Sequence, residues 1–155
     1  GSGRLAAASA SARLDNPLCG DRIALDVRLE HGKIVAIGHD TRGCLLCRAA
    51  ASWLASEVPG VAPEQFAAAH RELLALLQGA ATESSVRASL LPFSPAREHK
   101  SRHGCVLLPF EALQRALTGP RRTSPVRNHP APPAHDRDRA LVGEARESQP
   151  WRSAA

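Results

Sequence analysis

Residues 22–37 carry the pattern that most restricts what this chain can fold into. Apolar side chains alternate with polar or small ones in the first half of this stretch, at Ile23, Leu25, Val27 and Leu29. A period of two is typical of a strand with one buried face. Residues 30–33 supply a glycine-containing turn, and residues 34–37 form a second apolar run. The stretch therefore predicts an antiparallel hairpin, and a third strand is expected around Leu14.

The hydrophobic period changes to that of a helix after the hairpin. Residues 44–58 and 63–79 place apolar side chains at helical spacing and end in Gly- or Pro-containing segments. We expect a short helix within residues 80–91, a loop over 92–104 and a last helix over 105–117. The predicted fold class is α+β, with a small antiparallel sheet of about three strands packed on one face by helices.

Composition divides the chain into three parts. Residues 1–12 are rich in Gly, Ala and Ser, and we expect a disordered N-terminal segment or a cloning remnant there. Residues 13–118 hold the regular hydrophobic pattern and form the predicted folded domain. Residues 119–155 contain six prolines and few large apolar side chains. We predict that this tail is disordered, with folding on a partner as the alternative.

Charge and hydropathy limit the classes of partner. The formal net charge is +5, but seven Arg against four acidic residues lie after residue 118, so the domain before them is close to neutral. No basic block is interleaved with aromatic residues, and no apolar run reaches the ~18 residues of a membrane span. We therefore expect neither a nucleic-acid nor a membrane partner. With no secretory leader evident and an Ala/Arg-rich composition, we expect a cytoplasmic, bacterial protein.

The four cysteines favour a metal or catalytic site over disulfides, given the absence of a secretory context. Cys19 precedes the first hairpin strand, whereas Cys44 and Cys105 are expected to open helices, and each of the three has a glycine neighbour. A helix N-terminus lowers the pKa of a thiol, so we expect Cys44 and Cys105 to lean towards the thiolate. Thiolate is the form that binds metal or attacks sulfur.

Asp21 lies two positions after Cys19, so in extended structure the two side chains share a face. Asp21 could be a turn residue, but it could also complete a set of four ligands with Cys19, Cys44 and Cys105. Three thiolates and one carboxylate suit tetrahedral zinc or the iron of an iron–sulfur cluster. Because a carboxylate holds iron less tightly than a thiolate, a cluster bound in this way could be handed on.

Two further residues have open roles. Cys47 forms a CxxC motif with Cys44, and it could be a further ligand, a resolving thiol or a small buried hydrophobe. His103 lies two residues before Cys105 and could supplement the metal site, shuttle protons or remain a solvated loop residue.

Three stretches of the sequence resemble a known family. They are NPLCGDRIALDV at 16–27, RGCLLCRAAASWL at 42–54 and SRHGCVLLPFEAL at 101–113. Their content and order resemble the U-type iron–sulfur cluster assembly scaffolds, which comprise IscU, SufU and the N-terminal domain of NifU. The long interval between the last two stretches is closest to the SufU type. The resemblance implies an α+β fold of the SufE/IscU kind.

The same resemblance implies a cofactor and its ligands. Cys19, Asp21, Cys44 and Cys105 would hold a transient [2Fe–2S] cluster or Zn²⁺, and Cys105 or Cys44 would accept persulfide sulfur. The chain departs from the IscU type at Gly104, where that type has a histidine.

The implied function is that of a scaffold or carrier rather than an enzyme, with sulfurtransferase-like activity as an addition. Such a scaffold accepts sulfur from a cysteine desulfurase, takes up iron, builds [2Fe–2S] and transfers it to apo iron–sulfur proteins. The first alternative is a zinc-dependent sulfur-relay partner of a cysteine desulfurase. The second is a structural zinc domain for protein interaction.

Overall fold

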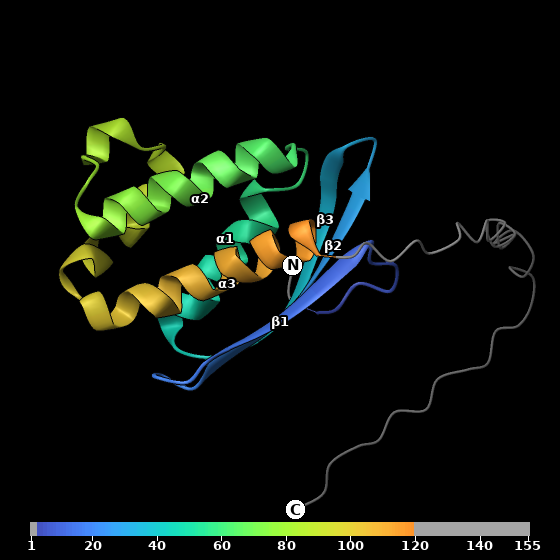
Figure 1. Cartoon of the computed structure of the whole chain (residues 1–155), viewed down its shortest axis with the longest axis horizontal. Coiled ribbons are helices and arrows are strands. Elements are labelled where there is room, and N and C mark those ends of the chain that lie inside the picture. Colours follow the sequence, from blue (N-terminus) through green and yellow to red (C-terminus); the bar gives the residue numbers. More distant parts are fainter. Residues whose placement is uncertain (1–2, 120–155) are drawn as a thin grey trace, which may run out of the picture. The chain divides into compact units, whose positions relative to one another are not determined.

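The computed structural model describes residues 3–119 and contains one three-stranded sheet. Its strands are β1 (Ala10–Asn16), β2 (Asp21–Glu30) and β3 (Lys33–Arg42), which pair antiparallel in the order β1-β2-β3 (Figure 1). Ile23 and Val27 of β2 are buried and Arg28 is exposed, as the alternating pattern predicts. Asp26, on the predicted polar face, is an exception, because it is buried in an ion pair with Arg4. The α+β prediction is confirmed.

The hairpin turn lies where the sequence predicts it. His31 and Gly32 both have positive φ, 50° and 76°, which is the backbone of the two-residue turns that match strand twist. The second strand is longer than expected, because β3 continues past Ile37 to Arg42. This extension carries the chain to the end of the sheet at which Cys19 and Asp21 lie.

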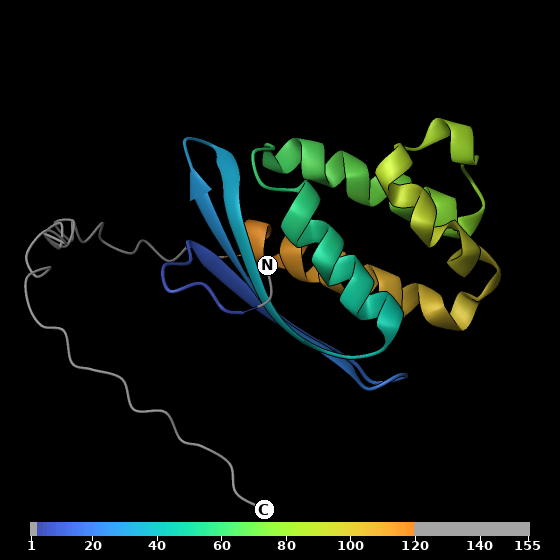
Figure 2. The same cartoon turned by 180° about the vertical axis from the view of Figure 1, so that it is seen from behind.

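The helices form two layers on one face of the sheet (Figure 2). α1 (Leu45–Glu57) packs on β3, and α3 (Lys100–Thr118) packs on β1, β2 and α1. α2 (Pro63–Gln78) contacts α3 and the 3₁₀ segment η2 (Ala88–Glu98). The helices predicted over 44–58 and 63–79 are confirmed as α1 and α2. A short 3₁₀ turn, η1 (Glu83–Ser85), falls in the region where a short helix was expected.

The loop predicted over residues 92–104 is wrong. Residues 88–98 form η2, with Pro92 and Pro95 inside it, and α3 begins at Lys100 rather than at Cys105. The start of α3 is a polar turn that shows no apolar period, so the sequence pattern could not report it. Cys105 therefore lies inside a helix and not at its first residue.

The N-terminal segment also differs from its prediction. β1 begins at Ala10, where a strand was expected only around Leu14, and the Gly3 backbone N–H donates to the His39 carbonyl at 2.8 Å. Arg4 forms an ion pair with the buried carboxylate of Asp26. Residues 3–12 are thus packed on the sheet, because cross-strand pairing compensates for their small side chains. The expected disordered tail lies, from residue 120 onward, outside the described residues.

The core lies between the sheet and the two helical layers. Three of the aromatic rings in the described part of the chain stack together: the ring centroids of Trp53 and Phe110 are 5.3 Å apart, and those of Phe66 and Phe110 are 6.1 Å apart. The Trp53 indole N–H donates to the Ser89 carbonyl at 2.8 Å, which ties η2 to α1. None of the helices within residues 3–119 has the length and hydrophobicity needed to cross a membrane.

Candidate metal centre

Asp21 is the residue around which the candidate site is organised. It is the first residue of β2 and is buried. Its Oδ1 accepts the backbone N–H of Cys44 at 2.9 Å, and its Oδ2 accepts the Cys44 thiol at 3.3 Å. A Cβ at position 43 would lie 2.8 Å from the Asp21 Cγ, so this approach requires Gly43.

The surroundings of Asp21 keep its carboxyl group ionised. Burial alone raises its pKa, but the backbone N–H of Cys44 and the thiols of Cys19, Cys44 and Cys105 donate hydrogen bonds that lower it. The net pKa lies below the usual range of an aspartate. An ionised carboxylate among thiols is a favourable site for a cation.

The loop between β1 and β2 presents Cys19 to this carboxylate. Asn16 starts the loop, and its side-chain Oδ1 accepts the backbone N–H of Leu18 at 3.0 Å. The Gly20 backbone N–H donates to the Asn16 carbonyl at 2.8 Å and closes the turn. The Asn-Pro start of the loop is therefore an Asx turn, and it leaves Cys19 half-buried at the mouth of the site.

Cys105 completes a compact group of donors. The ligand atoms of Cys19, Asp21 and Cys105 all lie within 4.8 Å of one another. In a tetrahedral zinc site with Zn–S bonds of about 2.3 Å, two sulfurs lie about 3.8 Å apart. The three donors are thus within about 1 Å of the spacing that a bound metal imposes, so this donor set fits zinc or a cluster iron.

The expectation of a lowered pKa at Cys105 is wrong for the chain without metal. Cys105 is fully buried in the second turn of α3, away from the exposed N–H groups of the helix start. Burial, followed by hydrogen bonds with Cys19, Asp21 and Cys44, raises the pKa of its thiol. A metal ion bound here would displace the Cys105 proton, because a coordinating thiol is deprotonated by its metal.

Cys44 reaches the group through Asp21. It is the N-cap residue of α1, as predicted, with extended backbone angles of φ −65° and ψ 170°. Its thiol is half-buried and contacts the Asp21 carboxylate, whereas the group within 4.8 Å consists of Cys19, Asp21 and Cys105. Cys44 is thus both a neighbour of the donors and accessible from outside.

Cys47 lies behind the site rather than in it. It is fully buried within the hydrophobic core, as a small buried hydrophobe would be. Burial, and then the charges of Asp21, Cys44 and Cys19, raise its pKa to about 12. The structure does not bring Cys47 into the three-residue group.

His103 is also separate from the group. It lies in the first turn of α3, two residues from Cys105, and so it projects from a different face of the helix. Its Nε2 lies 3.1 Å from the Arg97 carbonyl oxygen. The structure thus places His103 against η2, and the proposed supplementary ligand is not at the metal centre.

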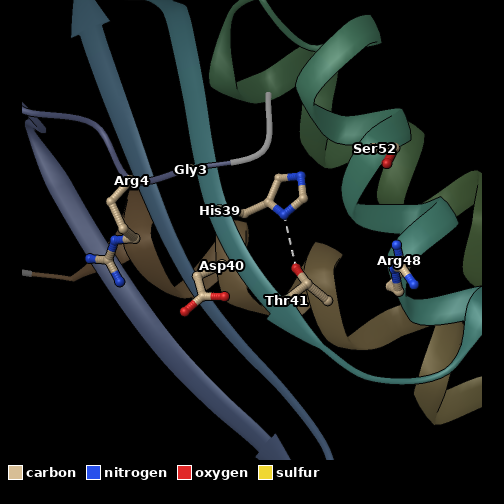
Figure 3. Close-up of a pocket in the computed structure, with 7 residues that line it drawn as sticks. All are labelled: Gly3, Arg4, His39, Asp40, Thr41, Arg48 and Ser52. Atoms are coloured by element: carbon tan, nitrogen blue, oxygen red, sulfur yellow. Dashed lines mark hydrogen bonds between the residues drawn. The ribbon is translucent and has the colours of Figure 1, made fainter.

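A pocket of about 390 Å³ lies elsewhere, between the N-terminal segment, β3 and α1 (Figure 3). Its lining residues are Gly3, Arg4, His39, Asp40, Thr41, Arg48 and Ser52. The His39 Nδ1 is 2.9 Å from the Thr41 Oγ1, and burial lowers the pKa of this histidine. No thiol lines the pocket, so it is distinct from the cysteine site.

Residues 1–90 match the family model described as the NifU-like N terminal domain. The chain belongs to this family. The match includes the segments of Cys19, Asp21 and Cys44 and ends before Cys105. The predicted resemblance to the U-type scaffolds is therefore confirmed at the family level. A search of curated proteins finds no match.

Solved structures show the same fold. A NifU-like protein (N-terminal) from Brucella abortus is 24% identical with a TM-score of 0.68, over 75% of this chain and 81% of that one. A SufU from Fervidobacterium islandicum, described as a candidate iron–sulfur cluster assembly scaffold of the SUF system, is 23% identical with a TM-score of 0.67. It aligns over 76% of this chain and 85% of its own. A hypothetical protein is 27% identical with a TM-score of 0.66, over 76% and 87% of the two chains.

Proposed function

We propose that this chain is an iron–sulfur cluster assembly scaffold that holds its cargo on Cys19, Asp21, Cys44 and Cys105. The observation that carries the proposal is the convergence of two thiols and one carboxylate within 4.8 Å, with a third thiol bonded to the same carboxylate. These donors come from three parts of the chain that are far apart in the sequence. Residues that serve only in a turn, or as isolated buried cysteines, would have no reason to converge in this way.

Membership of the NifU-like N-terminal domain family and the likeness to a SufU support this proposal. The chemistry of the donors supports it as well. Thiolates bind iron–sulfur clusters, while a carboxylate is a harder and weaker ligand for them. A mixed set of this kind suits a [2Fe–2S] cluster that is assembled and then released to an apo-protein.

The chain would act as a carrier and not as an enzyme. Iron and sulfur are its cargo, and a cysteine desulfurase would supply the sulfur as a persulfide. Of the two candidate acceptors, Cys44 is half-buried and Cys105 is fully buried. An incoming persulfide therefore reaches Cys44 more readily than Cys105.

One reconstitution experiment tests the proposed function. The full chain is purified without oxygen, mixed with ferrous iron, L-cysteine and a cysteine desulfurase, and followed by visible absorption. We expect cluster absorbance that moves to an apo-ferredoxin on addition. Persulfide and tightly held zinc without a cluster would instead indicate the zinc-dependent sulfur relay. Zinc without either signal would leave a structural zinc domain.

Asp21 gives a sharper test of the site. We expect Asp21→Ala to slow cluster transfer to apo-ferredoxin by roughly tenfold, which corresponds to about 1.4 kcal/mol in activation free energy. The variant lacks the weakly held ligand that would be exchanged first when the cluster is released. Asp21→Asn keeps an acceptor for the Cys44 N–H and separates loss of charge from loss of that hydrogen bond. The exposed Asp15→Ala is the matched control. Unchanged transfer in both Asp21 variants would exclude Asp21 as the releasing ligand.

The sulfur relay remains the second candidate because of one observation. Cys44 contacts Asp21 but stays outside the group formed by Cys19, Asp21 and Cys105. A cation held by those three residues would leave Cys44 free to carry sulfur. Zinc content and persulfide, measured together on Cys44→Ser, separate the two functions: a relay loses only the persulfide, whereas a scaffold that uses Cys44 as ligand also loses its cluster.

A further inference from the structure

The CxxC motif at the start of α1 brings two different thiols together. Cys44 is the N-cap residue and Cys47 is the third residue of the helix. Residues three apart on a helix have Cβ atoms about 5–6 Å apart, and a disulfide needs about 4 Å. The backbone of Cys44 is extended but held on both sides, since its carbonyl accepts the Arg48 N–H at 3.1 Å and its N–H donates to the Asp21 Oδ1 at 2.9 Å. Rotation of the two cysteine side chains about χ1, with a small shift at the N-cap, must therefore close this gap.

The two thiols differ in accessibility. Cys44 is half-buried, and the next residue, Leu45, is 81% exposed. Cys47 is fully buried and packs in the core against which Cys44 also packs. An external sulfur compound can therefore reach Cys44, whereas Cys47 has no exposed surface. This is the arrangement of an attacking thiol and a resolving thiol.

The metal centre does not use Cys47, and the proposed function leaves one chemical need unmet. Sulfur arrives from a desulfurase as a persulfide, but a [2Fe–2S] cluster contains sulfide. Breaking the S–S bond of the persulfide to release sulfide requires a reductant next to the site. Cys47 is the remaining thiol of the described chain, one helical turn from the accessible Cys44.

We propose that Cys44 and Cys47 form a redox pair in which Cys47 resolves a persulfide on Cys44 and releases sulfide beside the metal centre. This inference rests on the proposed function, because that function supplies the persulfide. The Cys47 sulfur attacks the inner sulfur of Cys44, the S–S bond of the persulfide breaks, and a Cys44–Cys47 disulfide forms. The terminal sulfur leaves with the bonding electron pair and takes the Cys47 proton, giving one hydrogen sulfide. A dithiol reductant of the thioredoxin class restores both thiols and is itself oxidised to a disulfide.

The sequence makes the product easy to identify. Trypsin cuts after Arg42 and Arg48, so one peptide, residues 43–48, contains both cysteines of the pair. Cys19 and Cys105 fall in separate peptides, 14–22 and 103–115. The proposed disulfide therefore lowers the mass of a single peptide by two hydrogen atoms, whereas any other pairing joins two peptides.

The test uses the full metal-free chain, glutathione persulfide as the sulfur donor and no other reductant, without oxygen. We expect one sulfide released for each disulfide found in peptide 43–48. In Cys47→Ala we expect peptide 43–48 to keep an extra sulfur atom on Cys44 and sulfide release to fall at least tenfold. Cys47→Ser should behave in the same way, which separates loss of the thiol from any change in core packing. Equal sulfide release from wild type and both variants, or a disulfide that joins other peptides, would overturn the proposal.

A parallel measurement keeps this outcome apart from that of the proposed function. Ferrous iron and free sulfide are added in place of the persulfide, and cluster absorbance is recorded. Wild type and Cys47→Ala should form equal amounts of cluster, since Cys47 is not among the donors. If wild type forms no cluster in this assay, the scaffold function is refuted. If wild type forms the cluster but the Cys47 variants release as much sulfide from the persulfide as wild type does, only the redox pair is refuted.

Discussion

Asn16 and Gly104 meet where the loop before β2 touches α3. The Asn16 side chain holds the turn of Cys19 through the Leu18 N–H. Its Nδ2 also lies 2.8 Å from the point that a Cβ of residue 104 would occupy. Because Gly104 precedes Cys105, this close approach sets how near the Cys19 loop comes to the Cys105 thiol.

This contact predicts opposite signs for stability and metal affinity in Gly104→Ala. Alanine is favoured over glycine inside a helix by about 1 kcal/mol. The new Cβ, however, lies 2.8 Å from the Asn16 Nδ2, so the Asn16 amide must shift. We expect this shift to weaken its hydrogen bond to the Leu18 N–H, to loosen the Cys19 loop and to lower Co²⁺ affinity roughly tenfold, or about 1.4 kcal/mol. The thiolate-to-cobalt charge-transfer band reports this affinity in a titration.

The double variant Asn16→Ser/Gly104→Ala tests whether the collision is the cause. The shorter serine makes room for the Cβ and keeps an oxygen that can accept the Leu18 N–H, so the double variant should bind Co²⁺ more tightly than Gly104→Ala alone. Ser101→Ala, an exposed change one turn earlier on α3, is the matched control. Wild-type affinity in Gly104→Ala would show that this contact does not position Cys19.

The sequence predicts the identity of the grouped donors but not how they are held. Cys19 and Asp21 share a face because the chain is extended there, which spacing alone reveals. Asn16 was missed as a positioning residue, although its Asn-Pro dipeptide is a turn signal. Its contact with Gly104 joins positions 88 residues apart in the chain, and no local pattern reports such a contact. The raised pKa of Cys105 was missed for the same reason, since it follows from tertiary burial.

At the scale of elements, local patterns predict α1, α2 and the hairpin because each has a clear period and a turn or glycine end. They fail for α3, whose first turn has only polar side chains before Cys105. They fail for β1 as well, because Ala10 and Ala12 are buried by strand pairing rather than by hydrophobicity. Both failures concern elements whose stability comes from their neighbours.

Asp26 fastens the N-terminal segment to the middle of the sheet. Burial raises the pKa of this carboxyl group, but hydrogen bonds from Arg4, Ser11 and the Leu5 N–H lower it by more. The net pKa is below its ordinary value of 3.8. The Ser11 hydroxyl donates at 2.6 Å and the Leu5 N–H at 3.0 Å. The carboxylate form is therefore the one that holds residues 4–11 in place.

We expect Asp26→Asn to lower the free energy of unfolding at neutral pH by about 2–3 kcal/mol, through the loss of charged hydrogen bonds. Since the folded pKa is depressed, the contribution of Asp26 is complete above pH 3.8 and is lost as the pH falls through the folded value. The gap between wild type and variant, measured by urea unfolding, should close as pH falls from about 5 towards 2. Asp15→Asn, at an exposed ion pair with Arg22, is the control and should change stability little. If the difference in unfolding free energy between wild type and Asp26→Asn does not change with pH, the ionised carboxylate is not what holds the N-terminal segment.

At the scale of the whole molecule, the three thiol-bearing segments collect the positive charge of the described chain. Residues 14–22, 41–48 and 98–105 hold five basic and three acidic residues, and one of the acids is the buried Asp21. The rest of residues 3–119 holds eight of each sign. We therefore expect anions to be attracted more strongly to this part of the described chain than to the rest of it.

This field predicts how the accessible thiols choose between alkylating reagents. At low salt, anionic iodoacetate should alkylate Cys19 and Cys44 faster, relative to neutral iodoacetamide, than it would without this field. The ratio of the iodoacetate rate to the iodoacetamide rate should fall by roughly threefold or more between low and high salt. The double charge reversal Arg42→Glu/Arg102→Glu, at exposed positions beside Cys44 and Cys105, should lower the ratio at low salt.

The matched control for this charge reversal is Arg28→Glu/Lys33→Glu, at the hairpin end of β2 and β3, where Arg28 faces Glu30 at 3.2 Å; both double variants change two basic residues to glutamate. It changes the net charge of the molecule without changing the field at the thiols, so the ratio of rates should stay at its wild-type value. Equal effects of the two charge reversals would mean that net charge alone governs the reagents. A selective effect at the thiol end means that the fold concentrates charge where an anionic persulfide or an acidic partner must arrive.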